Sequence, residues 1–218
     1  MAQNKSDVPS KRKSQTWRLL LFALTFLTAG LGAAENKIIV FFGDSLTAGL
    51  GLDPDEAFPA LIQKKIDAAG IHAQVVNAGL SGETTAGGLR RLNWILRQKM
   101  DVFVIELGAN DGLRGISPES SRANLQTIIA RVREKYPQAA IVLAGMKLPT
   151  NLGPEHTAKF AAIYPELAQA NHLALIPFLL ADVGGIANLN QADGIHPTAR
   201  GHEIVANNVW AVVQPLLR

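Results

Sequence analysis

Residues 37–46 have the sequence K-I-I-V-F-F-G-D-S-L, an almost unbroken apolar run that ends at a glycine followed by polar residues. A strand with one face in water alternates apolar and polar residues, whereas a strand covered on both faces is apolar throughout. Residues 37–42 therefore predict a strand of a parallel sheet. In open sheets of this kind, ligands bind beyond the carboxyl ends of the strands, which directs attention to the residues that follow Phe42.

Four further runs have the length and composition of buried strands, namely 73–77, 102–107, 139–144 and a weaker one at 173–176. Apolar residues at helical spacing fill the intervals between these runs and follow the last one. Strands that alternate with helices predict an α/β fold, here a three-layer α/β/α sandwich around a five-stranded parallel sheet. No linker, repeat or change of composition interrupts the chain after Glu35, so residues 35–218 are expected to form one domain.

Caps and helix breakers predict several helix boundaries. One helix should begin at Ser117-Pro118, a favourable N-cap and first position, and stop before Pro137. Pro165 is expected to bend or shorten the next helix, and the last helix should begin at Pro197.

The basic character of the chain comes from its first 34 residues. The formal net charge is +3, with 21 Lys and Arg against 18 Asp and Glu, and the chain has no cysteine. Residues 1–34 hold five of those basic residues and one of the acids, which leaves 16 basic and 17 acidic residues in 35–218. The body is nearly neutral, so no nucleic-acid partner is expected. Disulfides and cysteine nucleophiles are excluded.

Residues 1–34 have the three parts of a secretory signal peptide. Basic residues at 11–13 and Arg18 precede an apolar run at 19–31, and the small residues Gly32-Ala33-Ala34 follow it. Cleavage after Ala34 is expected, although an uncleaved anchor remains an alternative because the apolar stretch falls only a little short of the roughly 20 residues of a span. Export without cysteine favours a bacterial periplasm, with no stable membrane span after cleavage.

Polar side chains follow the predicted strands at one edge of the sheet. Ser45 follows the first strand, Asn110 follows the third, and Asp193 and His196 precede the last helix. A serine nucleophile needs a base, the base needs an orienting carboxylate, and the reaction needs donors for a developing oxyanion. These four residues supply one candidate for each role, so the edge is suited to acyl transfer.

At these residues the chain resembles the SGNH (GDSL-type) hydrolases. Four blocks match in order: G-D-S-L at 43–46, a glycine block at 77–84, G-A-N-D at 108–111 and D-G-I-H at 193–196. The resemblance covers about 37–217 and is strongest to the bacterial periplasmic thioesterase, lysophospholipase and arylesterase subgroup. It implies a flavodoxin-like sheet and a serine ester hydrolase that acts on carboxylic esters or thioesters through an acyl-enzyme, without cofactor or metal.

The resemblance also implies a role for each matched residue. Ser45 would be the nucleophile, His196 its base and Asp193 the partner of the base. The oxyanion hole would be formed by the N–H groups of Ser45 and Gly82 and the side chain of Asn110. Gly79 is the alternative for the glycine position.

Apolar residues on the loops of this edge, Leu113, Leu148 and Pro149, are candidates for binding the substrate's acyl chain. The loop 182–191 is small and polar for such a role, so the chain-length preference stays open. A metal site built from Asp193 and His196 with a further histidine lacks a known ligand spacing. The enzyme is expected to act as a monomer on a small-molecule ester or thioester.

The sequence leaves two other functions open and disfavours two more. A carbohydrate O-acetylesterase would share the fold and the mechanism, and a catalytically idle periplasmic binding module would share only the fold. A nucleotide-binding protein is disfavoured, because the first loop has neither a G-x-G-x-x-G nor a Walker A sequence. An α/β-hydrolase is disfavoured because the G-x-S-x-G elbow is absent.

Four polar residues near the motifs are expected to be structural. Asp44 should cap a turn or helix, Asp111 should accept hydrogen bonds that hold its loop, and Glu106 should be a hydrogen-bonded carboxylate inside a strand. His202 is expected at a solvated or capping position on the last helix.

Overall fold

The computed structural model describes residues 36–217, so the predicted signal peptide at 1–34 lies outside the described residues. The described part contains a five-stranded sheet in which all neighbouring strands are parallel, in the order β2-β1-β3-β4-β5. The strands are β1 (Lys37–Gly43), β2 (Ala73–Gly79), β3 (Val102–Glu106), β4 (Ala140–Ala144) and β5 (Ala174–Ile176). The predicted α/β fold with a flavodoxin-like strand order is confirmed.

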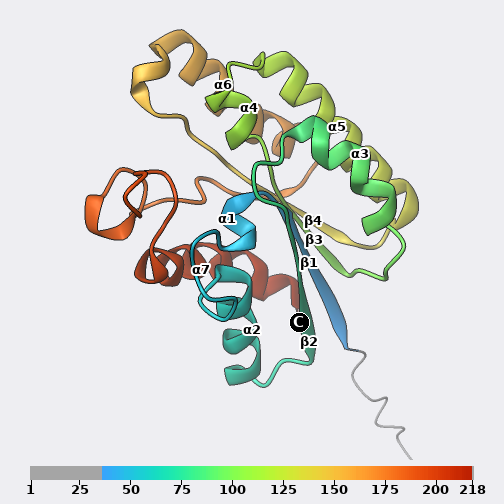
Figure 1. Ribbon diagram of the computed structural model, residues 1–218. Coiled ribbons are helices and arrows are strands. Elements are labelled where there is room, and N and C mark those ends of the chain that lie inside the picture. The colour runs from blue at the N-terminus through green and yellow to red at the C-terminus, as the bar shows by residue number, and fades with distance from the viewer. Residues whose placement is uncertain (1–35, 218) are drawn as a thin grey trace, which may run out of the picture. The chain divides into compact units, whose positions relative to one another are not determined.

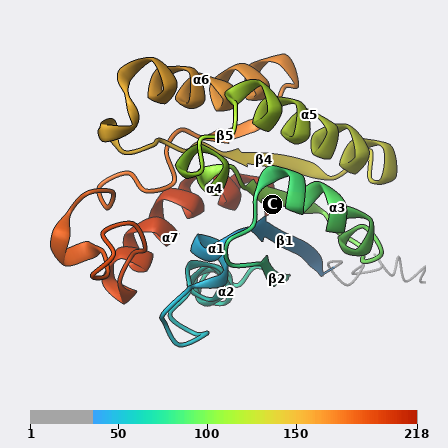
Figure 2. The same cartoon turned by 45° about the horizontal axis from the view of Figure 1, so that its top comes forward.

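Helices cover both faces of the sheet (Figures 1 and 2). On one side lie α2 (Phe58–Ala68) and α7 (Ala199–Val213), and on the other lie α3 (Thr85–Ile95), α5 (Pro118–Lys135) and α6 (Pro154–Ala170). Shorter helices are α1 (Ser45–Ala48), α4 (Ala109–Leu113) and the 3-10 turns η1 (Thr150–Leu152), η2 (Ala187–Leu189) and η3 (Gln214–Leu217). The three-layer prediction is therefore confirmed.

The apolar run of β1 is explained by its two covered faces. Residues 39–42 are fully buried, and successive side chains point to opposite layers. Phe41 meets Phe58 of α2 edge to face at 5.4 Å, whereas Phe42 stacks on Phe103 of β3 at 5.4 Å. The guanidinium of Arg91, on α3, lies 4.3 Å from the centre of the Phe42 ring. The central residues of this strand thus pack against a helix layer or a neighbouring strand.

One helix prediction is confirmed, one is wrong in part, and one is two residues off. The side chain of Ser117 accepts a hydrogen bond from Ser120 N at the start of α5, which ends at Lys135, before Pro137. Helix α6 continues through Pro165 for five more residues, so the proline does not shorten it. Helix α7 begins at Ala199, with Thr198 as its N-cap, two residues later than predicted. Within residues 36–217, no helix has the length and hydropathy needed to cross a membrane.

Candidate active site

The switch in strand order between β2-β1 and β3-β4 brings the ends of β1 and β3 side by side, and helix α1 begins directly after β1 (Figure 1). Ser45 is the first residue of α1 and is 7% exposed. Gly43 is needed at this turn, because a Cβ there would lie 2.1 Å from Thr47 Oγ1 and 2.4 Å from Glu106 Oε2. The local packing thus holds Ser45 at the carboxyl edge of the sheet.

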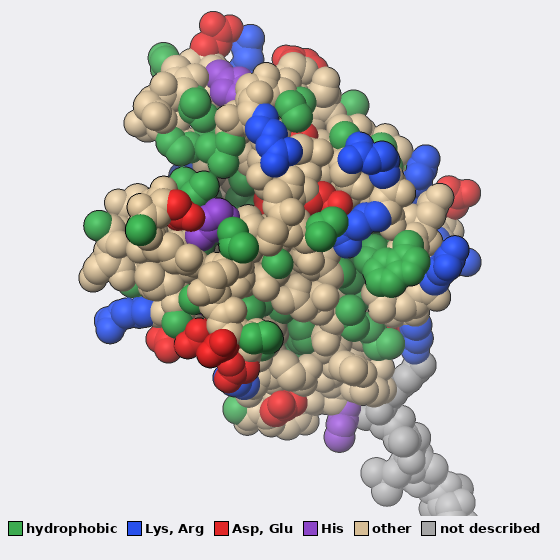
Figure 3. Space-filling model, viewed as in Figure 1, with side chains coloured by type: hydrophobic (Ala, Val, Ile, Leu, Met, Phe, Trp, Pro, Cys, Tyr) green, Lys and Arg blue, Asp and Glu red, His purple; other side chains and the backbone are tan. Residues whose placement is uncertain are grey.

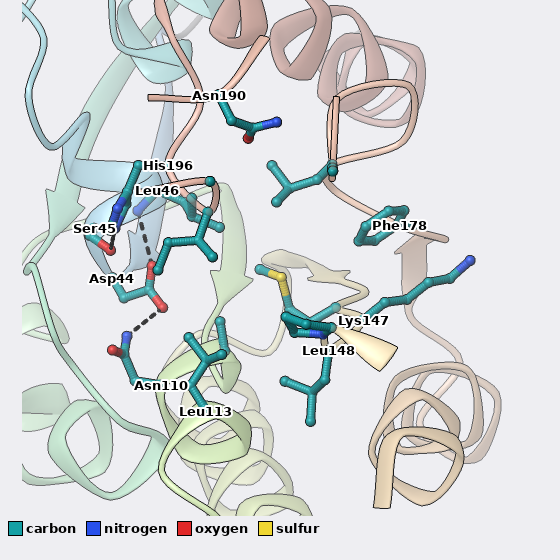
Figure 4. Close-up of a pocket in the computed structure, with 18 of the residues that line it drawn as sticks. Asp44, Ser45, Leu46, Asn110, Leu113, Lys147, Leu148, Phe178, Asn190 and His196 are labelled. Carbon is teal, nitrogen blue, oxygen red and sulfur yellow. Dashed lines mark hydrogen bonds between the residues drawn. The ribbon is translucent and has the colours of Figure 1, made fainter. Parts of the chain in front are cut away.

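Ser45, His196 and Asp193 form one hydrogen-bonded chain. Ser45 Oγ lies 2.8 Å from His196 Nε2 (Figure 4), and His196 Nδ1 lies 2.6 Å from Asp193 Oδ2. The other carboxylate oxygen of Asp193 accepts the N–H groups of Ile195 and His196, each at 3.0 Å. These two backbone N–H groups, followed by the His196 side chain, lower the pKa of Asp193 to about 2. An ionised Asp193 keeps the proton on Nδ1 and leaves Nε2 able to accept the Ser45 proton.

Asn110 lies in α4 and points its amide nitrogen toward the end of β1 (Figure 4). Its Nδ2 donates to Asp44 Oδ2 at 2.9 Å and to the carbonyl oxygen of Glu83 at 3.0 Å. The amide is therefore fixed between the segment that carries the candidate nucleophile and the loop after β2.

The two candidate glycines differ in their surroundings. Gly82 has a φ of 78°, and in the part of the chain that the structure describes its N–H has no hydrogen-bond acceptor. The N–H of Gly79 donates to Asn77 Oδ1 at 3.0 Å, and a Cβ on Gly79 would lie 2.3 Å from the backbone nitrogen of Ala48. Gly79 thus serves close packing of β2 against α1, whereas Gly82 keeps a donor unused.

Two buried carboxylates accompany the site. Asp44 is 1% exposed and its Oδ1 accepts Leu46 N at 3.0 Å, so the expected helix cap is confirmed. Glu106 is fully buried, and its Oε2 accepts from Thr47 Oγ1 at 2.6 Å and from Asp44 N at 3.1 Å, as expected for a structural carboxylate. Burial raises the pKa of Asp44 to about 6. Burial, followed by repulsion from Asp44, raises the pKa of Glu106 well above its usual range.

Arg91 ties the loops of this edge together and was not singled out from the sequence. Its Nε donates to Glu83 Oε2 at 2.6 Å. Its Nη2 donates to the carbonyl oxygens of Ala78 at 2.8 Å and Gly43 at 3.2 Å. One side chain therefore fixes the ends of β1 and β2 relative to each other. The sequence did carry a signal for this role, because Arg91 lies on the side of its helix that otherwise carries apolar residues.

A pocket of about 510 Å³ extends from the Ser45 end of the site. All three predicted contact residues, Leu113, Leu148 and Pro149, line it. Sequence reasoning missed Phe178 and Lys147, which lie across the pocket from Ser45 (Figure 4), and Leu180, which also lines it. The small and polar loop 182–191 reaches the pocket through Gly184, Gly185 and Asn190. Figure 3 shows this face hollowed, with hydrophobic side chains around the hollow.

The expectation for His202 is corrected in part. His202 is 2% exposed, so it is not solvated. Its Nδ1 accepts Phe58 N, the first N–H of α2, at 3.0 Å, and its ring stacks on that of Phe58 at 6.0 Å. His202 therefore caps α2, where the preceding Ala57 offers no side-chain cap, and not its own helix. Burial lowers the pKa of His202 to about 4.

Asp111, next to Asn110, accepts Thr85 Oγ1 at 2.5 Å and Thr85 N at 2.8 Å, which confirms its expected role in holding the loop. Among residues 36–217, no group of three His, Asp or Glu side chains converges as a metal site.

Comparison with known proteins finds a matching family and several similar proteins. The model of the GDSL-like Lipase/Acylhydrolase family matches residues 41–204. The chain is 42% identical to Esterase TesA of Pseudomonas aeruginosa over 196 residues, covering 89% of this chain and 95% of that protein. It is 37% identical over 202 residues to Thioesterase 1/protease 1/lysophospholipase L1 of Escherichia coli, covering 92% of this chain and 94% of that protein.

One further protein and one solved structure are similar to this chain over most of its length. An arylesterase of Vibrio mimicus is 35% identical over 193 residues, covering 88% of this chain and 95% of that protein. The crystal structure of TesA superposes with a TM-score of 0.80 at 41% identity, covering 83% of this chain and all of that one.

Proposed function

The chain belongs to the GDSL-like lipase/acylhydrolase family, and we propose that it hydrolyses carboxylic esters and thioesters through an acyl-enzyme on Ser45. The observation that carries the proposal is the chain of hydrogen bonds from Ser45 Oγ through His196 to Asp193, at 2.8 and 2.6 Å. It supplies a nucleophile, a base and an orienting carboxylate in contact with one another.

In the first half of the reaction, Ser45 Oγ attacks the substrate carbonyl carbon while His196 Nε2 accepts the hydroxyl proton. Asp193 stabilises the imidazolium through its contact with Nδ1. The bond from the carbonyl carbon to the leaving oxygen or sulfur then breaks, and His196 gives its proton to the leaving group. In the second half, water attacks the acyl-enzyme, His196 accepts a proton from it, and that proton returns to Ser45 Oγ as the acid leaves.

The negative charge on the tetrahedral intermediate requires donors. The N–H groups of Ser45 and Gly82 support such a role, because neither has an acceptor within residues 36–217. The Asn110 amide is the third candidate, held in place by Asp44. Removing one donor of an oxyanion hole lowers kcat by roughly 10²–10³-fold in other enzymes.

We infer the substrate class from the pocket. Its walls are mostly apolar, with Leu113 and Leu148 on one side and Phe178 on the other, which favours an acyl chain over a sugar. The names of the relatives, esterase, thioesterase, lysophospholipase and arylesterase, agree with such a substrate.

We further propose that residues 1–34 direct export to a bacterial periplasm and are removed, and that the enzyme is a monomer without a nucleic-acid partner. The basic and apolar segments of the leader and the nearly neutral charge of 35–218 support this. Mass spectrometry of the protein recovered from the periplasm should give Glu35 as its first residue, and light scattering should give a monomer mass. An intact leader or a dimer mass would contradict these points.

The central test is hydrolysis of p-nitrophenyl esters from acetate to palmitate, with Ser45→Ala as the control. Activity that this substitution abolishes supports the proposal, and a maximum at medium or long chains supports the acyl pocket. A sharp maximum at acetate would favour a carbohydrate O-acetylesterase. No hydrolysis by folded protein would favour a binding module.

A further inference from the structure

The proposed reaction does not use the Asp44 carboxylate, although it touches both the nucleophile segment and a candidate oxyanion donor. We propose that Asp44 is a positioning residue, which sets the place and donor strength of the Asn110 amide relative to Ser45. This inference rests on the proposed function, because it assigns Asp44 a role in the same reaction.

The two oxygens of Asp44 have separate partners. Oδ1 accepts Leu46 N at 3.0 Å and so caps α1, the helix that begins with Ser45. Oδ2 accepts the Asn110 amide at 2.9 Å. The side chain is almost completely buried, so both oxygens are largely shielded from bulk water. The carboxylate is thus a direct link between the helix of the nucleophile and the side chain of the donor.

The Asn110 amide has two hydrogens, and both have acceptors within 3.0 Å, Asp44 Oδ2 and the carbonyl oxygen of Glu83. A developing oxyanion must share one of them. A hydrogen bond to a buried carboxylate is stronger than one to a neutral carbonyl, so the Asp44 contact is the one that persists. That contact also polarises the amide and strengthens its second N–H as a donor.

The surroundings leave the negative charge on Asp44. Glu106 is the neighbouring carboxylate, and its Oε1 has no partner among the described residues. Burial raises the pKa of Asp44 to about 6 and, followed by repulsion from Asp44, raises that of Glu106 well above its usual range, so Asp44 is the carboxyl of the pair that ionises more readily. The other titratable groups nearby are His196, whose charge lowers the pKa of Asp44, and Tyr164, whose hydroxyl donates to Leu107 O at 3.1 Å.

The other buried carboxylate, Asp111, follows Asn110 in the chain, and its oxygens are occupied by Thr85 and Ser121. Arg91 lies on the other side of the turn and pairs with Glu83. No cation contacts Asp44 among the described residues, so the Asn110 amide is its main side-chain donor.

The substitution Asp44→Asn separates the two contacts. Asparagine caps helices as well as aspartate does, so its oxygen can keep the bond to Leu46 N. The other end of the side chain then presents an NH₂ group to the NH₂ group of Asn110. The cap survives, whereas the link to Asn110 and the negative charge that faces Glu106 and His196 are lost.

The test is a double-mutant cycle with wild type, D44N, N110A and D44N/N110A, measuring kcat and KM for p-nitrophenyl butyrate per folded molecule. D44N is expected to lower kcat about tenfold or more with KM almost unchanged, because it removes a hydrogen bond to a charged group that fixes the Asn110 amide in the transition state. If Asp44 acts through Asn110, the same substitution in the N110A background lowers kcat less than about threefold. Equal effects in both backgrounds, or an unchanged kcat in D44N, would overturn the proposal.

Asp101→Asn is the matched control. Asp101 also accepts a backbone N–H, that of Ile38 at 2.8 Å, but at the opposite edge of the sheet, so kcat should stay at the wild-type level. Labelling of wild-type Ser45 by a p-nitrophenyl phosphonate tests the underlying hydrolase function separately from the cycle.

If D44N does not fold, the Asn110 side-chain amide can be followed by NMR in the wild-type protein, with N110A identifying the signal. The ¹H shift of the hydrogen facing Asp44 should move upfield as pH falls through about 6, where Asp44 gains its proton. A signal that stays unchanged from pH 7.5 to 5 would contradict the link.

Discussion

Ser45 and His196 are separated by 151 positions in the sequence, and Ser45 Oγ lies 2.8 Å from His196 Nε2. The two side chains come from segments near the beginning and the end of the domain's sequence, namely the turn after β1 and the loop before α7. Parallel strands direct both segments to the same edge of the sheet. The contact is therefore a consequence of the topology.

The first prediction concerns Asp193. In Asp193→Asn the amide oxygen can keep the two backbone N–H bonds, but the charge that holds the Nδ1 proton is lost. In a serine protease the equivalent change costs about 10⁴-fold in kcat by leaving the wrong histidine tautomer. Because Asp193 is partly exposed, a smaller loss, of roughly 10²-fold or more, is expected for kcat on p-nitrophenyl butyrate. Wild-type turnover by a folded variant would remove Asp193 from the mechanism.

The second prediction separates the two glycines. Gly79→Ala should yield little folded protein, since its Cβ would overlap the backbone of Ala48 at 2.3 Å. Gly82→Ala has space, with its nearest neighbour at 3.5 Å, but a φ of 78° costs an L-residue about 1 kcal/mol. It should fold with a slightly lower Tm and a reduced kcat. Thermal melts and turnover measured together check this, and a fully active Gly82→Ala of normal stability would show that the site does not depend on a glycine conformation at residue 82.

The third prediction concerns the acyl pocket. Leu113→Ala removes apolar surface from the pocket wall, so KM for the octanoate ester should rise about fivefold, whereas acetate should be unaffected. Leu50→Ala is the matched control, because Leu50 is 44% exposed, close to the 40% of Leu113, and does not line the pocket. Equal changes for the two esters would show that Leu113 does not contact the acyl chain.

The fourth prediction is a pH dependence of stability. The pKa of His202 is about 4 in the folded protein against 6.5 ordinarily, so the unfolded chain binds the proton first as pH falls. Stability from His202 is therefore complete above pH 6.5 and is lost between 6.5 and 4, by about 3 kcal/mol at 1.36 kcal/mol per pKa unit.

The variant His202→Asn provides the comparison, because its amide oxygen can accept Phe58 N without titrating in this range. Urea unfolding at several pH values should give a free energy of unfolding that falls more steeply in the wild type than in the variant. Contributions from Asp44 and Asp193 are common to both proteins. Parallel curves from pH 6.5 to 4 would show that His202 is not responsible.

Much of the fold and of the site could be predicted because burial leaves a pattern in the sequence. The apolar run at 37–42 predicted a doubly covered strand, and the residues after the strands predicted which side chains would meet. The contacts between Ser45, His196 and Asp193 agree with that expectation.

What could not be predicted depends on partners that only tertiary structure provides. His202 has an ordinary helical context, and its burial follows from the missing cap of α2. The position of Arg91 on the apolar side of its helix is visible in the sequence, but the two backbone carbonyls that it joins are not. Phe178 forms the far wall of the pocket because β5 is short and the chain turns immediately after it.

The most direct test of the central claim is covalent labelling of the wild-type enzyme with a p-nitrophenyl phosphonate, followed by peptide mass spectrometry. A serine activated by His196 should take up one phosphonyl group per molecule, on Ser45, with release of one equivalent of p-nitrophenol and loss of esterase activity. Uptake at another residue, or labelled Ser45 with esterase activity intact, would contradict the account.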